Sequence, residues 1–309
     1  MSLVTDKRLD FHKALIQREV LCLSVLSDKD KTKHKLTLDY VASNCDKGSK
    51  SSIEIGTALL NKMAHRAGLS AVKRKAKPDG QTLGNLFEDI CASFIEDTFL
   101  QLSTLRPGVW VVEKTGTRSR SAIGKYEQYS HLKELDILAS KHSELRNFLG
   151  DGYTVAPDVV VARLPEPDST INKISTIVDE KSAKYTKIRS ANHENPCEPS
   201  QLLHASISCK FTMRSDRSQN TRTEALNLIR SRKGQVPHIV AVTAEPTASR
   251  IASLALGTGD IDCVYHAALF ELLETLKDLD DYSSLEMLEG MVEGKRLKDI
   301  SDLPLDLAI

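Results

Sequence analysis

Apolar residues recur every three to four positions in one long segment, 84–102 ("GNLFEDICASFIEDTFLQL"). Its leucine, isoleucine, phenylalanine and cysteine side chains form a stripe along one face, which is typical of a helix packed against a core. Glu88 lies next to this stripe, so we expect its side chain to point inward. Similar patterns predict further helices over 5–26, 53–67, 121–148 and 221–234.

Short runs rich in β-branched residues predict strands between these helices. The predicted strands cover 106–114, 154–164, 171–181, 202–212 and 236–246. The last one, "VPHIVAVTAEP", is apolar through its centre, as is typical of a strand buried on both faces. The strand at 202–212, the helix at 221–234 and the strand at 236–246 form a crossover unit, which is almost always right-handed. The fold class is therefore α/β, with a central mixed β-sheet flanked by helices.

The chain length of 309 residues allows one large domain or two small ones, and 40% apolar with 27% charged residues is ordinary for a globular protein. No internal repeat or low-complexity linker divides the sequence. We therefore expect a single domain over 1–309. Within it, a helical part over about 1–105 precedes a sheet core over about 106–270 and a helical tail over 271–309.

The formal net charge is zero, which by itself does not favour nucleic-acid binding. The distribution is uneven, however: the segment 206–234 holds seven basic and two acidic residues, and the C-terminal third is acidic. A neutral protein with one basic face fits a DNA-binding protein, and it also fits an enzyme with a dipolar surface.

The six cysteines are widely separated, with no C-x-x-C pair and no zinc-ligand spacing with histidine. This pattern indicates reduced thiols. The N-terminal stretch "ALIQREVLCLSVLS" is interrupted by Gln-Arg-Glu and is not typical of a signal peptide. No stretch reaches the roughly 18–20 apolar residues of a membrane span. We therefore expect a cytoplasmic protein.

Hydrolysis of a phosphodiester requires hard oxygen ligands for a divalent metal, an activated water and a cation beside the phosphate. Two carboxylates and a lysine at adjacent strand ends would supply these groups, and Pro157-Asp158 offers the first carboxylate. Two segments compete for the remainder. Asp179-Glu180-Lys181 matches the Pro-Asp…(Asp/Glu)-x-Lys nuclease pattern literally, whereas Ser208-Cys209-Lys210 lacks the carboxylate but is followed by Glu224 fourteen residues after the lysine.

Strand alternation favours the second segment. Ser206, Ser208 and Lys210 share one face of the predicted strand, and the apolar residues between them fill the other face. Glu224, in the first turn of the next predicted helix, can fold back over the end of that strand. Its carboxylate would then occupy the space of the missing acid.

Each candidate also has a structural explanation. Glu224 fits a capping box with Thr221, Asp158 fits a turn before a strand, and Lys210 fits a strand-end lysine whose stem is buried. Their expected convergence on one sheet edge favours a catalytic site.

The segment "MRSDRSQN" follows Lys210 closely and carries base-reading chemistry. An arginine fork recognises the O6 and N7 edge of guanine, and an aspartate accepts from cytosine N4. Arg214, Asp216 and Arg217 could therefore read adjacent G·C pairs. The alternative is a salt-bridged turn without a role in recognition.

With these residues assembled, the chain resembles the NgoMIV-type type II restriction endonucleases, in the CCGG-reading branch of the PD-(D/E)xK nucleases. The resemblance covers most of the chain. It is carried by the blocks "GNLFEDIC", "APDVVV", "LLHASISCKFTMRSDRSQN", "GLSAVKRKAKPDGQT", "PHIVAVTAEPTASRIASLALGTGDIDCVYH" and "GKRLKDISDLPLDLA".

The resemblance implies a permuted active site built from Pro-Asp, Ser-x-Lys and a glutamate on a helix. The implied catalytic residues are Asp158, Lys210, Glu224 and Glu88, and Cys209 is implied as a metal ligand through its backbone carbonyl. By the same resemblance, Asp179 and Lys181 become structural. The implied cofactor is Mg²⁺, with two ions per active site.

The resemblance also implies how DNA is read and how the chain assembles. The implied inner CCGG readers are Arg214, Asp216 and Arg217, and the implied outer readers are Gln81, Arg250 and Asp46. The expected partners are double-stranded DNA with the palindrome GCCGGC and three further copies of the chain in a homotetramer. The expected products carry 5′ overhangs. The restriction-endonuclease-like core would carry additional N-terminal helices.

Two other functions remain open from the residues themselves. One is a catalytically silent, sequence-specific DNA-binding protein on the same scaffold. The other is a nuclease of DNA repair with little sequence preference, for which the Arg-Ser-Asp-Arg cluster would have no reading role.

Overall fold

A computed structural model of the chain describes residues 2–75, 79–115, 123–141, 157–213, 215–257 and 259–309. The described residues form two compact units. Unit 1 consists of Met1–Gln101, Ile207–Thr223 and Ile239–Ile309, and unit 2 consists of Leu102–Ser206 and Glu224–His238. The single domain expected over 1–309 stays a prediction.

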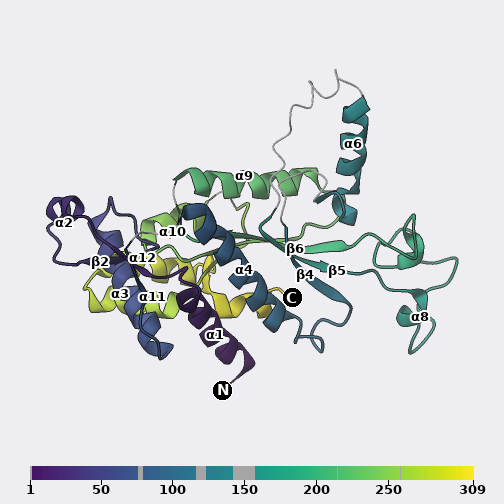
Figure 1. Ribbon diagram of the computed structural model, residues 1–309. Helices are drawn as coiled ribbons and strands as arrows, with labels where there is room; N and C mark the ends of the chain where they lie inside the picture. The colour runs from purple at the N-terminus through teal and green to yellow at the C-terminus, as the bar shows by residue number, and fades with distance from the viewer. Residues whose placement is uncertain (1, 76–78, 116–122, 142–156, 214, 258) are drawn as a thin grey trace. The chain divides into compact units, whose positions relative to one another are not determined.

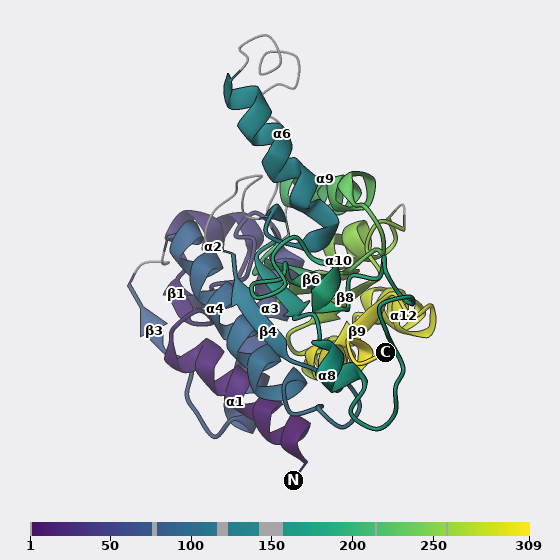
Figure 2. The same ribbon diagram turned by 90° about the vertical axis from the view of Figure 1, so that its right-hand side faces the viewer.

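Unit 1 is rich in helices, which pack in pairs (Figures 1 and 2). Helix α1 lies along α4, and α3 lies along α11, while α12 contacts both α10 and α11. The longer helices are α1 (Leu3–Gln17), α3 (Lys50–Arg66), α4 (Gly80–Phe99), α10 (Ala248–Ala255), α11 (Leu269–Asp278) and α12 (Tyr282–Glu293). Shorter ones are α2 (Asp28–His34), the 3₁₀ helix η3 (Ile300–Asp302) and α13 (Leu303–Asp306). The apolar stripe predicted in 84–102 is buried in α4, where Phe94 packs edge-on against Phe11 of α1 at 5.3 Å between ring centroids.

Two mixed sheets carry the strands, in agreement with the predicted α/β class. The larger sheet has the strand order β4-β5-β6-β7-β8-β9, with β4 and β5 antiparallel and β7, β8 and β9 parallel. Its strands are β4 (Trp110–Lys114), β5 (Val159–Arg163), β6 (Leu202–Lys210), β7 (His238–Thr243), β8 (Cys263–His266) and β9 (Leu297–Asp299). The smaller sheet, in unit 1, has the order β2-β1-β3 and comprises β1 (Leu23–Val25), β2 (Tyr40–Ala42) and β3 (Lys73–Arg74).

Strand β6 and helix α9 (Ser215–Ser231) each belong to both units. The residues of β6 up to Ser206 lie in unit 2 and those from Ile207 lie in unit 1, whereas α9 passes from unit 1 to unit 2 after Thr223. Unit 2 also holds η1 (Glu127–Tyr129), α6 (Ser130–Lys141), α8 (Asp168–Ile171) and η2 (Ser190–Asn192). In unit 2, Tyr129 donates a hydrogen bond to the carbonyl of Leu228 at 3.0 Å, which fixes η1 against the C-terminal half of α9.

The helix predicted over 5–26 is too long, because α1 ends at Gln17. Glu19 adopts a left-handed backbone conformation with φ of 58°, which ends the helix. The next residues, Val20 to Leu23, are all buried, so they form a continuous run that enters β1 rather than one face of a helix.

The strand predicted over 171–181 is wrong. Ile174 and Ile177 are 96% and 64% exposed, so their alternation does not face a core. The side chain of Asn172 instead accepts hydrogen bonds from the amides of Ile177 and Val178 and donates to the carbonyl of Val178. These three local bonds fold the segment into a loop.

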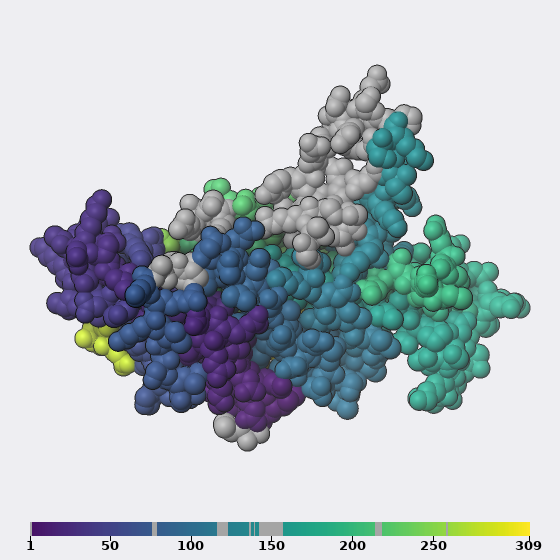
Figure 3. All heavy atoms as spheres, viewed as in Figure 1, coloured from purple at the N-terminus to yellow at the C-terminus, as the bar shows by residue number. Residues whose placement is uncertain are grey.

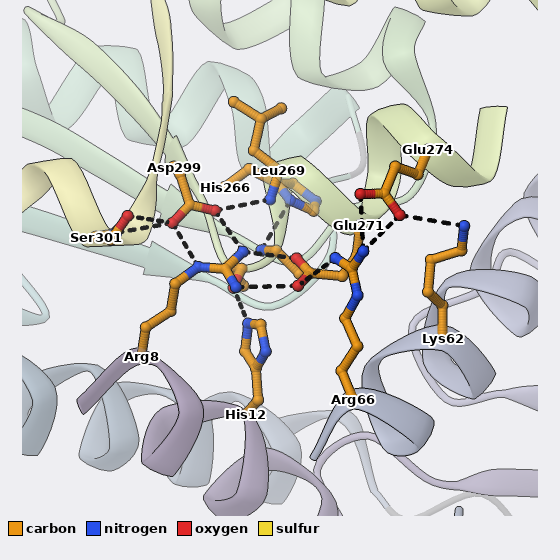
Figure 4. A network of polar contacts seen from close by, with 12 residues as sticks. Arg8, His12, Lys62, Arg66, His266, Leu269, Glu271, Glu274, Asp299 and Ser301 are labelled. Atoms are coloured by element: carbon orange, nitrogen blue, oxygen red, sulfur yellow. Dashed lines mark hydrogen bonds and ion pairs between the residues drawn. The ribbon is translucent and has the colours of Figure 1, made fainter. Parts of the chain in front are cut away.

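A network of ion pairs joins distant segments of unit 1 (Figure 4). Arg8 of α1 forms paired hydrogen bonds with Glu271 of α11 and with Asp299 of β9, at 2.6–3.0 Å. Arg66 of α3 contacts the same Glu271 and also Glu274. Burial raises the pKa of Glu271, but the bonds from Arg8 outweigh it and bring that pKa down to about 2. Glu271 is therefore held as a buried, paired carboxylate.

Candidate active site

Asp158 lies immediately before β5 in unit 2 and is 7% exposed. Its main-chain carbonyl accepts a hydrogen bond from the amide of Thr115 at 3.0 Å, which continues the antiparallel pairing of β4 with β5. The four residues that follow, from Val159 to Ala162, are completely buried. The pairing of β4 with β5 and the buried strand therefore fix the backbone of Asp158. The group of Asp158 that can bind a ligand is its side-chain carboxylate.

Glu224 is 7% exposed and lies in the interior of α9. The helix was expected to begin at Thr221 but begins at Ser215, so the capping-box explanation of Glu224 is wrong. A capping box acts at the first turn of a helix, where amide groups have no partner within the helix. A buried glutamate in the middle of a helix needs another explanation, and the expected catalytic role supplies one.

Lys210 is the last residue of β6, the strand on which the alternation argument was based. Ser206 and Ser208 on its face of the strand are 4% and 7% exposed, and Ile207 and Cys209 on the other face are 0% and 3% exposed. Both faces of this part of β6 are therefore covered.

Helix α4 and the end of β6 meet in unit 1. The rings of Phe87 and Phe211 pack with their centroids 5.6 Å apart. Glu88 and Lys210 are the sequence neighbours of these two phenylalanines, so the packing brings the segments that carry them together. Glu88 is half-buried, in agreement with the prediction that it lies beside the apolar stripe.

The competing triplet at 179–181 lies in an exposed loop of unit 2, not at a strand end. The side chain of Asp179 accepts from the amide of Lys181 at 2.9 Å, and the amide of Asp179 donates to the hydroxyl of Ser182 at 3.0 Å. These bonds close a small turn and support a structural role for Asp179 and Lys181.

The residues expected to read the inner base pairs surround the start of α9. Asp216 and Arg217 lie in its first turn, and Arg214 lies outside the described residues. The backbone of the described part of this segment is helical from Ser215.

Two of the three residues expected at the outer base pairs lie together in unit 1. Asp46, between β2 and α3, forms an ion pair with Arg250 of α10. The amide of Gly48 also donates to Asp46 at 2.9 Å. Gln81 is exposed in the first turn of α4, where its main-chain amide donates to the carboxylate of the N-cap residue Asp79.

Sequence reasoning missed Glu245, which is 0% exposed and follows the buried strand β7 in unit 1. Its carboxylate accepts from the amides of Met213 at 2.8 Å and Thr247 at 3.2 Å, and it lies 3.9 Å from the guanidinium of Arg250. The signal in the sequence was a single acidic residue at the end of the apolar run "HIVAVTAEP".

Carboxylate and carbonyl oxygens are the ligands that Mg²⁺ prefers. Among the described residues, no group of three or more histidine, cysteine, aspartate or glutamate side chains is placed to hold a metal ion. No helix in the described part of the chain is both long and apolar enough to cross a membrane.

Comparison with known proteins gives a family match over nearly the whole chain. The family described as "NgoMIV restriction enzyme" matches residues 11–309. The type II restriction enzyme NgoMIV of Neisseria gonorrhoeae is 45% identical over 307 residues, which cover 99% of each of the two chains.

Proposed function

The chain belongs to the NgoMIV restriction enzyme family, and from this premise we propose that it cuts double-stranded DNA at a palindrome containing CCGG. It is a type II restriction endonuclease, a site-specific deoxyribonuclease, and enzymes of this class generally use a divalent metal ion. The observation that carries the catalytic assignment is Glu224: it is a buried acid within α9 and has no capping role. The proposed sequence is GCCGGC, cut to leave 5′-phosphate ends and 5′ overhangs.

The proposed catalytic residues each have a separate task. Asp158 and the carbonyl of Cys209 would hold Mg²⁺, with two ions per active site. The metal, when bound, supplies Lewis-acid polarisation of the phosphate and a lowered pKa for the attacking water. Lys210 would place its ammonium beside the oxygens on which negative charge develops. Glu224 would supply the acid that is missing beside Lys210 in the metal site, and Glu88 would be an auxiliary acid beside them.

Base recognition is proposed for two groups of residues. Arg214, Asp216 and Arg217 would read the inner CCGG, because guanidinium forks match guanine and a carboxylate accepts from cytosine. Gln81, Arg250 and Asp46 would read the outer pairs. The ion pair between Asp46 and Arg250 supports this assignment, since a paired carboxylate orients a guanidinium before DNA is bound.

A homotetramer made of two dimers is proposed for the assembly, in the cytoplasm of a bacterial cell. Exposed apolar side chains in unit 2 support self-association. Tyr185 and Ile174 are 92% and 96% exposed on a segment that Figure 3 shows in teal and green at its right-hand edge. An ion pair between Arg189 and Asp168, at 2.6 Å, braces this segment from within. Sedimentation of the purified protein measures the number of chains.

The function is tested by incubating the protein with plasmid DNA, with and without Mg²⁺, and sequencing the ends. We expect discrete fragments with CCGG at every end only when Mg²⁺ is present. A gel shift without cleavage would instead identify a silent DNA-binding protein. Heterogeneous fragments would identify a nuclease with little sequence preference.

A further inference from the structure

Glu245 is a buried carboxylate that none of the proposed catalytic or base-reading roles uses. It sits between the end of β7 and the start of α10, and its backbone is held on both sides. Its amide donates to the hydroxyl of Thr243 at 3.1 Å, and its carbonyl contacts Nε2 of His266 at 3.1 Å. Nδ1 of His266 accepts from the amide of Ala268, so Nε2 carries the proton and donates to Glu245.

The carboxylate of Glu245 contacts two different parts of unit 1. One oxygen accepts from the amide of Met213, two residues before α9 begins and one residue before Arg214 in the sequence. The other oxygen accepts from the amide of Thr247, the residue before α10. Arg250 in α10 lies 3.9 Å away and is also paired with Asp46. The side chain of Glu245 thus connects the segment that precedes the proposed inner base-reading residues with Arg250, one of the proposed outer base-reading residues.

Burial of this acid is unfavourable in itself. Desolvation raises the pKa of Glu245 above its usual value, although the bonds from Met213 and Thr247 oppose the rise. The two amide donors and the nearby guanidinium of Arg250 offset this cost. The carboxylate is thus held where its two oxygens bind two separate segments of unit 1.

We propose that Glu245 is a positioning residue for sequence recognition, which holds the segment entering α9 and Arg250 in one fixed arrangement. The proposal rests on the proposed function, because it requires that these two groups read bases. It follows that loss of Glu245 loosens discrimination at inner and outer base pairs together. Hydrolysis of the phosphodiester itself needs no contact with Glu245 and is expected to continue.

The test is Glu245→Gln. Glutamine has one acceptor oxygen, so it cannot accept from both amides, and it carries no charge for Arg250. The recognition site is first defined by sequencing the ends made by the wild-type enzyme. Cleavage is then measured as kcat/KM on the cognate duplex and on duplexes with one inner or one outer pair replaced. We expect discrimination to fall tenfold or more at both positions, in a variant whose cooperative thermal unfolding shows that it is folded.

Glu271→Gln is the matched control, because Glu271 is another buried carboxylate of unit 1 and accepts its hydrogen bonds from Arg8 and Arg66 rather than from the proposed readers. This variant should lower the melting temperature and keep wild-type discrimination. If the Gln variant of Glu245 folds poorly, Glu245→Asp retains the charge but is one methylene too short to reach both amides, and the same loss of discrimination is expected.

Wild-type discrimination in a folded Glu245 variant overturns the proposal. A loss confined to inner or to outer pairs also overturns it, because the two groups would then act separately. A wild-type enzyme that cuts without sequence preference is a different result: it contradicts the proposed function itself.

Discussion

At the scale of single residues, two lysines competed for one catalytic role. Lys210→Ala is expected to abolish cleavage and to leave DNA binding without Mg²⁺ largely intact. The reason is that the ammonium acts where charge builds up during reaction, whereas affinity is spread over many phosphate contacts. Lys181→Ala, in the exposed turn, is the control and should cut as the wild type does. The assignment is wrong if the Lys210 variant cuts within about tenfold of wild type and the Lys181 variant is inactive.

Glu224 permits a sharper test than the sequence suggested, since its position inside α9 removes the capping explanation. Glu224→Gln retains the shape of the side chain and removes its charge. We expect the cleavage rate to fall by at least about two orders of magnitude, because the metal site loses one of its charged acids, with little change in melting temperature. Rates and thermal melts on the same preparation provide the measurement. A fully active Gln variant would leave Glu224 with a structural role only.

At the scale of elements, the start of α9 carries the residues proposed to contact the inner base pairs. Arg214→Ala and Arg217→Ala should each remove about 1–3 kcal/mol of discrimination between a CCGG duplex and a scrambled one. A role limited to phosphate contacts predicts equal weakening on both duplexes and a salt dependence lower by about one unit per residue. Competition between the two duplexes at two salt concentrations distinguishes these outcomes.

The spacing of apolar residues in the sequence identified the elements well where those residues are in fact buried, as in β5, β6, β7, α3 and α4. It failed where a local signal was satisfied by other contacts. Thr221 and Glu224 have the spacing of a capping box, yet the helix continues six residues further toward its N-terminus. The alternating residues at 171–181 resemble a strand, but the three hydrogen bonds of Asn172 fold them into a loop. Glu245 was missed because its partner Met213 lies 32 residues away in the sequence.

At the scale of the whole molecule, the network around Glu271 predicts how stability depends on pH. The pKa of Glu271 is lowered from 4.5 to about 2, so its contribution is present above pH 4.5 and is lost as the pH falls toward 2. A shift of this size corresponds to about 3 kcal/mol of unfolding free energy. Glu271→Gln should therefore destabilise the protein at pH 7, and the difference from wild type should shrink between pH 5 and pH 3. Denaturant unfolding at several pH values measures both; an unchanged difference across this range would contradict the assignment.

The pairing of Arg8 with Asp299 spans 291 residues of sequence, and its pairing with Glu271 spans 263. During synthesis, Arg8 emerges from the ribosome first and its two carboxylate partners emerge among the last residues. A chain interrupted before Glu271 lacks both partners of Arg8, together with most of α11 and all of β9, against which α3 and β8 pack. Without these elements unit 1 cannot complete its packing. We therefore expect premature termination to yield fragments that are degraded rather than partly assembled nucleases. For a DNA-cleaving enzyme, late closure of the fold would confine cleavage to finished molecules.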